Sequence, residues 1–570
     1  MKQNIPNILI LMTDQQRFDT IAAAGYDHMH TPNLDRLVNE GCLFSNAYTP
    51  NPVCVAARHS MLTGTSSADH GFEFNLGATD DRMANDGLPT YARLLSENGY
   101  FTALAGKAHY KPVREHHGFD HLRLMEEIPG HLFDDAYMQH LHNEGLGEIK
   151  SPHGVRPLIY HIPQDPLMPD ENHGTYWLAD QAIDLITKNH DRPWAITVSW
   201  IHPHPPLHVP RKWRDLYKNK ELPTPVPPCR HHPYPEGDNE WMGDHLPENQ
   251  LREFREAYYG SISMIDDAIG SILDHLERQK TLDNTCILFL SDHGEMLGDK
   301  GMFQKTSPYE PSCRIPFIIR YPKRITPGTV DRRFVDLTDV LPTLLDAVNI
   351  SFPYKKSHEN CRIKGSSLLS RKDDRDRTYQ FTENHFGSNR WVAARDPRYK
   401  YVFFFNGGVE QFFDLEADPQ ECTNLIGSNA MPVAEYQRLK KACMAHESQW
   451  GPDGYVTRWG FDGRASTKTD PRGCAYFTHF PNSQFPSIGN EAPMTKAKRH
   501  IQELEQALKS QNGQLPWEPS SVVKTYLEEW KNKFVLAYGN DETTEELNDL
   551  AEAFIERATR QTMQSSASGD

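Results

Sequence analysis

Short apolar runs that alternate with helical stretches constrain the fold of this chain more than any other feature of its sequence. Strand-like runs occur at 7–12, 102–105, 194–200, 285–291 and 317–321, and helical stretches such as 33–40 and 88–98 lie between them. Because these runs are mostly apolar rather than alternating, we expect both of their faces to be buried. The pattern predicts an α/β fold in which helices sandwich a large, mostly parallel sheet.

A polar run, SRKDDRDR, near residue 370 predicts a domain boundary. We expect an α/β domain over residues 1–372 and a smaller C-terminal subdomain over residues 373–570. The segments RWVAARDPRYKYVFFFNG and EQFFDLEADPQECTNL predict a small antiparallel sheet in that subdomain. A helical extension follows, and two sets of apolar residues each share one helical face: Ile501, Leu504 and Leu508, and then Val523, Leu527, Trp530 and Phe534. These helices either pack within the chain or form a homo-oligomer contact.

Composition excludes several classes of protein. The chain has 570 residues, of which 38% are hydrophobic, so global disorder is excluded. Its net charge of -17 argues against non-specific nucleic-acid binding. No apolar run approaches the roughly 20 residues of a membrane span, and the N-terminus does not resemble a signal peptide. We therefore expect a cytoplasmic protein without a membrane partner, or a periplasmic or secreted one if a signal peptide has been removed.

Cysteine usage gives no sign of a disulfide framework or a zinc ribbon. The nine cysteines are scattered, and no pair has C-x-x-C spacing. At least one thiol is free, because the number is odd.

Acidic and polar residues follow two of the predicted strands. Asp14 and Gln15 end the first strand, and Asp292 and His293 end a later one. In an open α/β sheet the ligand site lies outside the carboxyl ends of the strands, so these side chains should converge. Their oxygen atoms suit a hard cation, and the imidazole also admits Mn²⁺. We expect one divalent metal, with Ca²⁺ first and Mn²⁺ or Mg²⁺ as alternatives.

The segment NPVCVAARHSMLTG places Cys54 at the start of a short helix, with Arg58 one turn later. A helix N-terminus and a nearby guanidinium both favour an anion, either a thiolate or a bound ester. A tyrosine-phosphatase-like loop would need Arg six positions after the Cys, and this chain has Ser60 there.

Taken together and in this order, the motifs of the chain resemble the sulfatase family of the alkaline phosphatase superfamily. The matching segments are MTDQQR, TPNLDRL, GCLFSNAY, CVAAR with SMLTG, GKAHY, HPHPP, LSDHGEMLGDKGMFQKTSPYEPSCRIPFII, RYKYVFF and FFDLEADPQECTNL. They extend from about residue 5 to residue 425, and they are specific as a set although each alone is weak.

The resemblance implies a catalytic mechanism in which Cys54 is oxidised to formylglycine. The hydrated aldehyde binds the metal, attacks sulfur and displaces the alcohol, and the sulfated intermediate then collapses to aldehyde and sulfate. The implied metal ligands are Asp14, Gln15, residue 54, Asp292 and His293. The implied catalytic and substrate-binding residues are Arg58, Lys107 and Lys305 as cations, His109 at the hydrated aldehyde, His204 and Lys305 at the leaving-group oxygen, and Asn75 at the substrate.

Two departures from the family pattern bear on this mechanism. The family's C-x-P-x-R has Pro where this chain has Ala56, which weakens recognition by the oxygen-dependent maturation enzyme. Radical maturases tolerate Ala there, so the partner that matures Cys54 is either a formylglycine-generating enzyme or a radical maturase. The pairs Asp14-Gln15 and Asp292-His293 resemble those of choline sulfatases, glycan sulfatases and phosphonate monoester hydrolases.

Three hypotheses about function follow. The first is a sulfuric ester hydrolase, acting on a sulfated carbohydrate through a leaving-group pocket shaped by residues 203–237 and about 140–175. The second is a phosphonate monoester or phosphodiester hydrolase on the same scaffold, which relative turnover of aryl sulfate and aryl phosphonate would distinguish. The third is a non-catalytic sulfoglycan-binding pseudoenzyme in which Cys54 stays a thiol. The intact set of metal ligands, Lys and His argues against the third.

Overall fold

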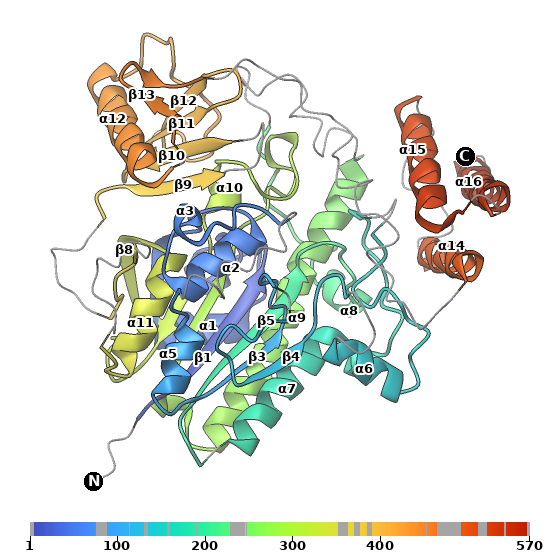
Figure 1. Cartoon of the computed structure of the whole chain (residues 1–570), viewed down its shortest axis with the longest axis horizontal. Coiled ribbons are helices and arrows are strands. Elements are labelled where there is room, and N and C mark those ends of the chain that lie inside the picture. Colours follow the sequence, from blue (N-terminus) through green and yellow to red (C-terminus); the bar gives the residue numbers. More distant parts are fainter. Residues whose placement is uncertain are drawn as a thin grey trace.

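An eight-stranded sheet forms the centre of the molecule (Figure 1). The structure, a computed structural model, describes residues 5–75, 88–112, 114–129, 135–156, 160–189, 191–227, 246, 248–351, 363–369, 377–384, 390–451, 453–463, 492–510, 521–540 and 543–566. The strand order is β4-β3-β5-β1-β6-β7-β2-β8. β7 pairs antiparallel with both of its neighbours, and the other pairs are parallel. The predicted, mostly parallel sheet is confirmed.

The strands of this sheet have the following bounds: β1 (Asn7–Asp14), β2 (Cys42–Tyr48), β3 (Phe101–Gly106), β4 (His121–Leu124), β5 (Trp194–Pro203), β6 (Thr285–Ser291), β7 (Phe317–Arg320) and β8 (Thr329–Asp336). Every residue of β1, β5 and β6 is buried, as expected for central strands covered on both faces.

Helices cover the two faces of the sheet in separate layers (Figure 1). α1 (Pro32–Glu40), α7 (Gly174–Lys188) and α9 (Glu248–Arg278) pack with one face. α2 (Cys54–Thr63), α5 (Tyr91–Glu97) and α11 (Val340–Ala347) pack with the other. The helix predicted over 88–98 begins later, at Tyr91, because the Thr90 hydroxyl caps it by accepting from the Arg93 amide at 3.1 Å. The helix predicted over 33–40 is confirmed as α1.

Shorter helices connect these layers. They are η1 (Ala22–Ala24), α3 (Ser67–His70), α6 (Ala136–Asn143), η3 (Asp170–Asn172), α8 (Arg211–Arg214), η5 (Leu282–Asn284), η6 (Asp299–Gly301), α10 (Glu310–Cys313) and η7 (Leu337–Asp339). Among the described helices, none combines the length and the apolar character needed to cross a bilayer.

A second, four-stranded antiparallel sheet follows in the chain. Its order is β12-β11-β10-β9, and α12 (Val433–Trp450) packs against it. The strands are β9 (Gln380–Asn384), β10 (Trp391–Arg395), β11 (Tyr399–Phe404) and β12 (Val409–Asp414), and a short hairpin of β13 (Val456–Thr457) and β14 (Gly460–Phe461) comes after α12. The predicted C-terminal antiparallel sheet is confirmed. The expected boundary after residue 372 falls in 370–376, outside the described residues.

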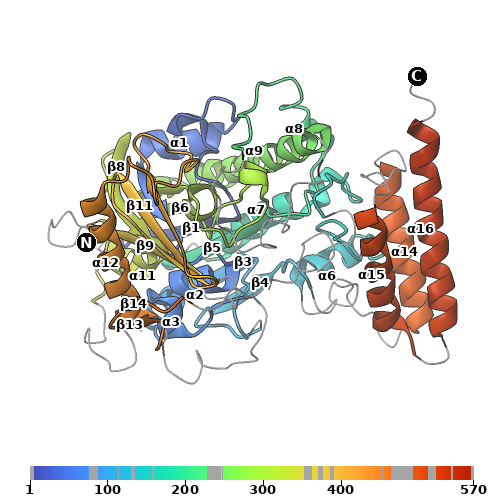
Figure 2. The same ribbon diagram turned by 90° about the horizontal axis from the view of Figure 1, so that it is seen from above.

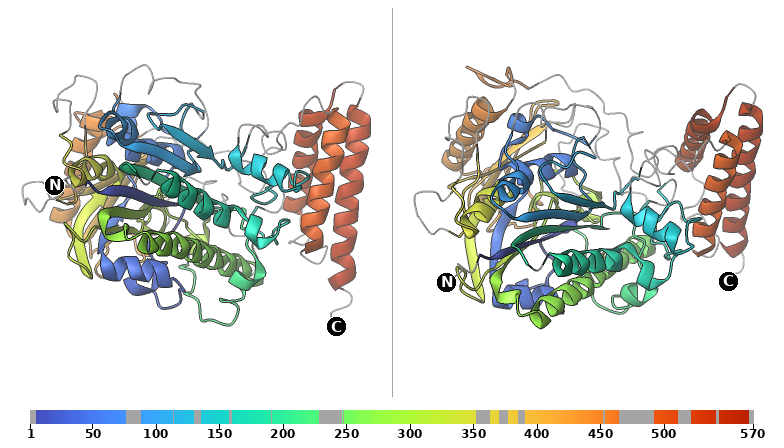
Figure 3. Two further views of the ribbon diagram at one scale, coloured as in Figure 1. Left: turned by 90° about the horizontal axis from the view of Figure 1, so that it is seen from below. Right: turned by 60° about the horizontal axis from the view of Figure 1, so that its bottom comes forward.

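Three C-terminal helices stand together at the opposite end of the molecule from α12 (Figures 2 and 3). They are α14 (Pro493–Ser510), α15 (Ser521–Tyr538) and α16 (Thr544–Ser566). Their predicted apolar faces are buried within the chain: Ile501, Leu504, Leu508, Leu527, Trp530 and Phe534. Val523 lies outside the described side chains. We call α14, α15 and α16 the C-terminal bundle.

Candidate active site

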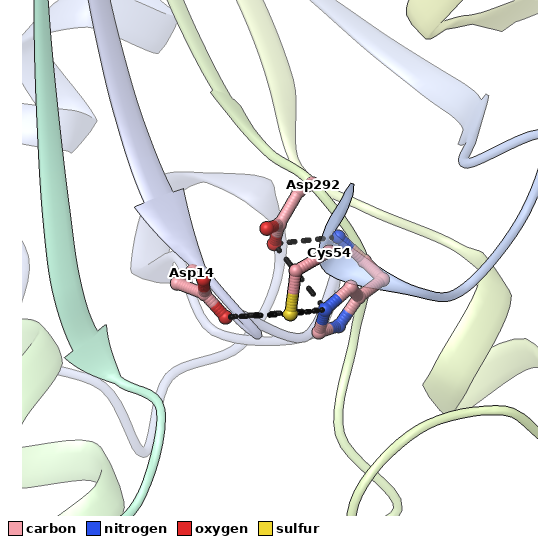
Figure 4. Close-up of side chains that lie close together, drawn as sticks. Asp14, Cys54 and Asp292 are labelled. Carbon is pink, nitrogen blue, oxygen red and sulfur yellow. Dashed lines mark hydrogen bonds and ion pairs between the residues drawn. The ribbon is translucent and has the colours of Figure 1, made fainter. Parts of the chain in front are cut away.

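Two carboxylates lie side by side at the carboxyl ends of β1 and β6 (Figure 4). Asp14 is the last residue of β1, and Asp292 follows Ser291, the last residue of β6. The parallel register pairs Thr13 with Ser291, so the two aspartates leave the sheet at the same level. Both side chains are fully buried. The convergence predicted from the strand ends is therefore present in the structure.

Cys54, the first residue of α2, points at the same place (Figure 4). Its Sγ lies 3.1 Å from His293 Nε2 and 3.9 Å from Asp14 Oδ1. One candidate ligand atom from each of Asp14, Cys54, Asp292 and His293 lies within 4.8 Å of the others. Two carboxylates and an imidazole on one point are a donor set for a divalent cation.

The orientation of His293 also fits a metal site. Its Nδ1 is 3.0 Å from the Gly294 carbonyl oxygen, which can only accept, so Nδ1 carries the proton. Nε2 therefore faces Cys54 and the aspartates, and in a neutral ring it is the atom whose lone pair a metal ion would take. A backbone acceptor that orients an imidazole in this way is the usual support for a histidine ligand.

Gln15 enters the site through an unusual backbone conformation. Its φ of 67° is left-handed, which is uncommon for a residue other than glycine. The backbone amide donates to Asp292 Oδ1 at 3.0 Å, and the side-chain Oε1 accepts from Lys305 Nζ at 2.8 Å. The Nε2 group donates to Glu295. These bonds hold the amide oxygen against Lys305 Nζ, which also contacts Cys54, a member of the candidate metal-binding cluster.

Arg58 holds the two aspartates in place. Its Nε donates to Asp292 Oδ2 at 2.8 Å, and Nη2 donates to Asp14 Oδ2 at 3.0 Å. Nη1 donates to the Lys107 carbonyl at 2.7 Å and to Ser199 Oγ at 2.9 Å. Every nitrogen of the guanidinium therefore donates a hydrogen bond, and two of the three nitrogens donate to the candidate ligand carboxylates of Asp14 and Asp292.

The two lysines of the predicted site are buried, which excludes the ordinary role of a solvated surface charge. Lys107 is 0% exposed and Lys305 is 9% exposed. Lys107 Nζ lies 2.6 Å from Asp14 Oδ2. Lys305 Nζ lies 2.9 Å from Cys54 Sγ. The sulfur therefore sits between an ammonium group and an imidazole.

These neighbours decide the ionisation of the site. Burial and the Asp14 carboxylate raise the pKa of the Cys54 thiol, but Lys305, Lys107 and His293 outweigh them, and the pKa lies below its ordinary value. Burial and repulsion from Asp292 likewise raise the pKa of Asp14, and the surrounding cations bring it below its usual range. The structure thus favours negative charge at the point where a nucleophile would stand.

His109 and His204 lie on either side of Glu127. His204 Nε2 is 3.6 Å from Glu127 Oε1, and His109 Nδ1 is 4.0 Å from Glu127 Oε2. Burial lowers the pKa of both imidazoles well below its ordinary value, so both rings are neutral at pH 7. His204 Nδ1 donates to the Pro205 carbonyl at 2.5 Å. Among the described residues, His109 Nδ1 has no hydrogen-bond partner.

Asn75 joins the site from the segment after α3. Its Oδ1 accepts from the Val55 backbone amide at 3.1 Å, which caps the first turn of α2. Its Nδ2 lies 3.8 Å from Cys54 Sγ. Asn75 therefore fixes the helix end that carries Cys54 and presents an N–H group beside it.

The sequence reasoning missed Glu127, which is central to the charge balance of the site. Its carboxylate pairs with Lys107 Nζ at 2.5 Å and with the guanidinium of Arg156. The neighbouring Glu126 accepts from the His109 amide at 3.0 Å. A weaker signal was present, because Glu126 and Glu127 are the second and third residues after the end of β4, but β4 itself was not predicted.

Comparison with known protein families finds two families whose sequences match this chain. The family described as "Sulfatase" matches residues 6–350, and the family described as "N-sulphoglucosamine sulphohydrolase, C-terminal" matches residues 298–448. The first match contains every site residue described above.

Similar curated proteins extend over most of the chain. An arylsulfatase of Clostridium perfringens is 34% identical over 465 residues, which cover 74% of this chain and 90% of the relative. A choline-sulfatase of Rhizobium meliloti is 34% identical over 460 residues, covering 75% of this chain and 84% of the relative.

Similar solved structures support the fold. The phosphonate monoester hydrolase of Agrobacterium radiobacter superposes with a TM-score of 0.66 at 24% identity, covering 80% of this chain and 99% of the other. A structure containing D-glucosamine-2-N,6-O-disulfate, described as BT4656, superposes with a TM-score of 0.61 at 22% identity, covering 79% of this chain and 99% of the other.

Proposed function

We propose, from the premise that this chain belongs to the sulfatase family, that it hydrolyses a sulfate monoester with a formylglycine made from Cys54. The family resemblance and the enzyme class predicted from the motifs are both confirmed. The observation that carries the proposal is the convergence of Cys54 Sγ with Asp14, Asp292 and His293, with the Lys305 ammonium 2.9 Å from the sulfur.

One divalent cation is part of the proposal. Asp14, Gln15, Asp292 and His293 would hold it together with residue 54, with Ca²⁺ as the first expectation and Mn²⁺ or Mg²⁺ as alternatives. When bound, the cation supplies positive charge that stabilises negative charge on the nucleophile and on the ester. Arg58 keeps both carboxylates oriented through its bonds of 2.8 and 3.0 Å.

The nucleophile requires oxidation of Cys54 by a maturation enzyme, either an oxygen-dependent formylglycine-generating enzyme or a radical maturase. The resulting aldehyde supplies, as its hydrate, one hydroxyl that can displace the alcohol at sulfur and a second hydroxyl whose deprotonation releases sulfate. Position 54 suits this role because the helix N-terminus and Lys305 favour negative charge there.

Lysine and histidine side chains would then handle charge and protons. Lys107 and Lys305 face the ester oxygens as ammonium groups in a buried site, where such charges act strongly. Lys305 Nζ holds a proton that can pass to the leaving oxygen, with His204 beside the same oxygen. His109, neutral and with its Nδ1 unpartnered among the described residues, can accept a proton from the hydrate. The Asn75 N–H group donates to the sulfate group.

The proposed substrate is a sulfated carbohydrate. An N-acetylglucosamine-6-O-sulfatase of Bacteroides thetaiotaomicron is 26% identical over 505 residues, which supports a sugar as leaving group. A phosphonate monoester or phosphodiester is the second candidate. The fold shared with a phosphonate monoester hydrolase favours it, and such esters carry the same single negative charge as a sulfate monoester.

Hydrolysis assays on protein matured in its host test the proposal. We expect turnover of an aryl sulfate and, more slowly, of an aryl phosphonate, with all turnover lost in Cys54→Ala. Cys422→Ala removes a thiol outside the site and should retain activity. A faster reaction with the phosphonate would favour the second candidate. Turnover that survives in Cys54→Ala would overturn the proposed nucleophile.

A further inference from the structure

The C-terminal bundle lies outside both family matches, which end at residues 350 and 448, yet it contacts a segment that reaches the active site. Glu503 on α14 is 6% exposed. Its Oε1 accepts from the Lys150 backbone amide at 3.2 Å, and its Oε2 accepts from Ser151 Oγ at 2.9 Å. Both bonds cross from the bundle to the segment 150–156, which we call the anchor segment.

The anchor segment is held in a defined shape beyond this point. Its backbone turns at Gly154, whose amide donates to the Ser151 carbonyl at 3.0 Å. The next residue, Val155, exchanges two hydrogen bonds with the Gln164 side chain, at 2.8 and 2.7 Å. The backbone of Gln164 pairs in turn with Leu207 and Val209, close to His204 in the chain. The anchor segment is thus held by Glu503 at its start and by Gln164 at the residue that precedes Arg156.

That residue is Arg156, whose guanidinium pairs with Glu127 inside the site. The Arg156 side chain is 3% exposed and lies over the Tyr160 ring, 5.3 Å from its centroid. Glu127 lies between two cations, because its other oxygen is 2.5 Å from Lys107 Nζ. Loss of Arg156 would leave Lys107 as the main partner of Glu127 and draw the ammonium group away from Asp14.

Apolar side chains also connect the C-terminal bundle with the anchor segment and the residues that follow it. Val155, Tyr160 and Ile162 belong to one buried cluster with Ile501 and Leu504 of the bundle. The bundle and the anchor segment thus share a core, and Glu503 is its polar link.

We propose that Glu503 is a positioning residue of the active site, acting through the anchor segment and Arg156 to hold Glu127 and thereby Lys107. The inference deepens the proposed function and rests on it. The bundle is then a structural part of the catalytic centre rather than an independent appendage.

A double-mutant cycle on the full-length, matured enzyme tests the proposal. Arg156→Met and Glu503→Leu are each expected to lower kcat/KM for an aryl sulfate by about tenfold to a hundredfold, because a displacement of about 1 Å is enough for such a loss. The double variant should be no worse than Arg156→Met, since both changes act through one contact. Glu503→Gln keeps an acceptor and a similar shape, so it should restore most of the activity lost in Glu503→Leu.

The control is Glu505→Gln, two residues along α14, where the carboxylate pairs with Arg557 on the exposed side of the bundle. It should match the wild type. Additive losses in the double variant, or full activity in Glu503→Leu, would overturn the proposal. The aldehyde content at residue 54 and the melting temperature are measured for each variant, so that a maturation or folding defect is recognised. Failure of the wild type to hydrolyse any sulfate ester would instead overturn the proposed function.

Discussion

At the scale of single residues, the site consists of buried side chains of opposite charge that pair with one another. Asp14 and Asp292 are fully buried, and each of them pairs with the guanidinium of Arg58. Isolated charges would be expensive to bury, so a set of this kind persists only when every member has partners. Removal of one member leaves another buried charge without its partner, so it should lower the stability of the fold as well as the activity.

Lys305→Met tests the cation beside the nucleophile. We expect kcat/KM to fall by about a hundredfold to a thousandfold, because the variant removes a preorganised charge from a buried site. The loss should grow for aryl sulfates with poorer leaving groups if Lys305 Nζ supplies the leaving-group proton. Steady-state kinetics over a leaving-group series measure both effects, and Lys323→Met on the surface is the control. An equal loss across the series would contradict the role in proton donation.

Arg58→Lys tests the orientation of the two aspartates. Lysine keeps the charge but cannot donate along the fixed fork that spans Asp14 and Asp292. We expect metal affinity to fall by about tenfold to a hundredfold, as for other groups that support metal ligands. Calorimetric titration with Ca²⁺ and Mn²⁺ measures it. An unchanged affinity would show that the carboxylates need no such support.

At the scale of elements, strand ends explain what could be predicted from the sequence. β1 and β6 are continuous apolar runs, so they were recognisable, and the residues that follow them lie in the site. β2, β4 and β8 mix buried with more exposed positions and show no such run. Glu127 was missed for that reason. Arg156 was missed because the segment around it has no periodicity, and only the tertiary contact with Glu127 identifies it.

α7 provides a pH-dependent prediction at this scale. His173 caps the helix, since its Nδ1 accepts from the Thr175 amide at 3.2 Å and its Nε2 donates to the His208 carbonyl at 2.9 Å. Burial lowers the pKa of His173 to about 4. As the pH drops, His173 of the unfolded chain binds a proton near pH 6.5, whereas His173 of the folded chain binds it only near pH 4. The free energy of unfolding therefore decreases as the pH drops through this window.

The His173→Asn variant isolates this contribution. Asparagine can still accept from the Thr175 amide but does not titrate. We expect the free energy of unfolding of the wild type to decrease by on the order of 3 kcal/mol more than that of the variant between pH 6.5 and pH 4. Urea unfolding at several pH values measures the difference. Parallel pH profiles would contradict the assignment.

At the scale of the whole molecule, the site joins parts of the chain that are far apart in sequence. Asp14, Cys54 and Asp292 come from two strand ends and one helix start on the same edge of the sheet (Figure 4). A ligand that binds this junction should stabilise the entire fold, because it binds the folded state in preference to the unfolded chain.

Removal of divalent cations tests this coupling. We expect a chelator to abolish activity and to lower the melting temperature, and we expect added Ca²⁺ or Mn²⁺ to restore both. Differential scanning calorimetry with and without chelator measures the shift. The variant Asp292→Asn should show a smaller shift than the wild type. A melting temperature that is indifferent to metal in the wild type would argue against a cation held by these residues.

The most direct test of the account is mass spectrometry of the tryptic peptide 37–58, from protein purified from its own host. This peptide contains Cys42 and Cys54, so Cys42 serves as an internal thiol reference. The account predicts that residue 54 carries an aldehyde despite Ala56, while Cys42 remains a thiol that can be alkylated. A peptide with two intact thiols in protein that hydrolyses sulfate esters would contradict the proposed nucleophile.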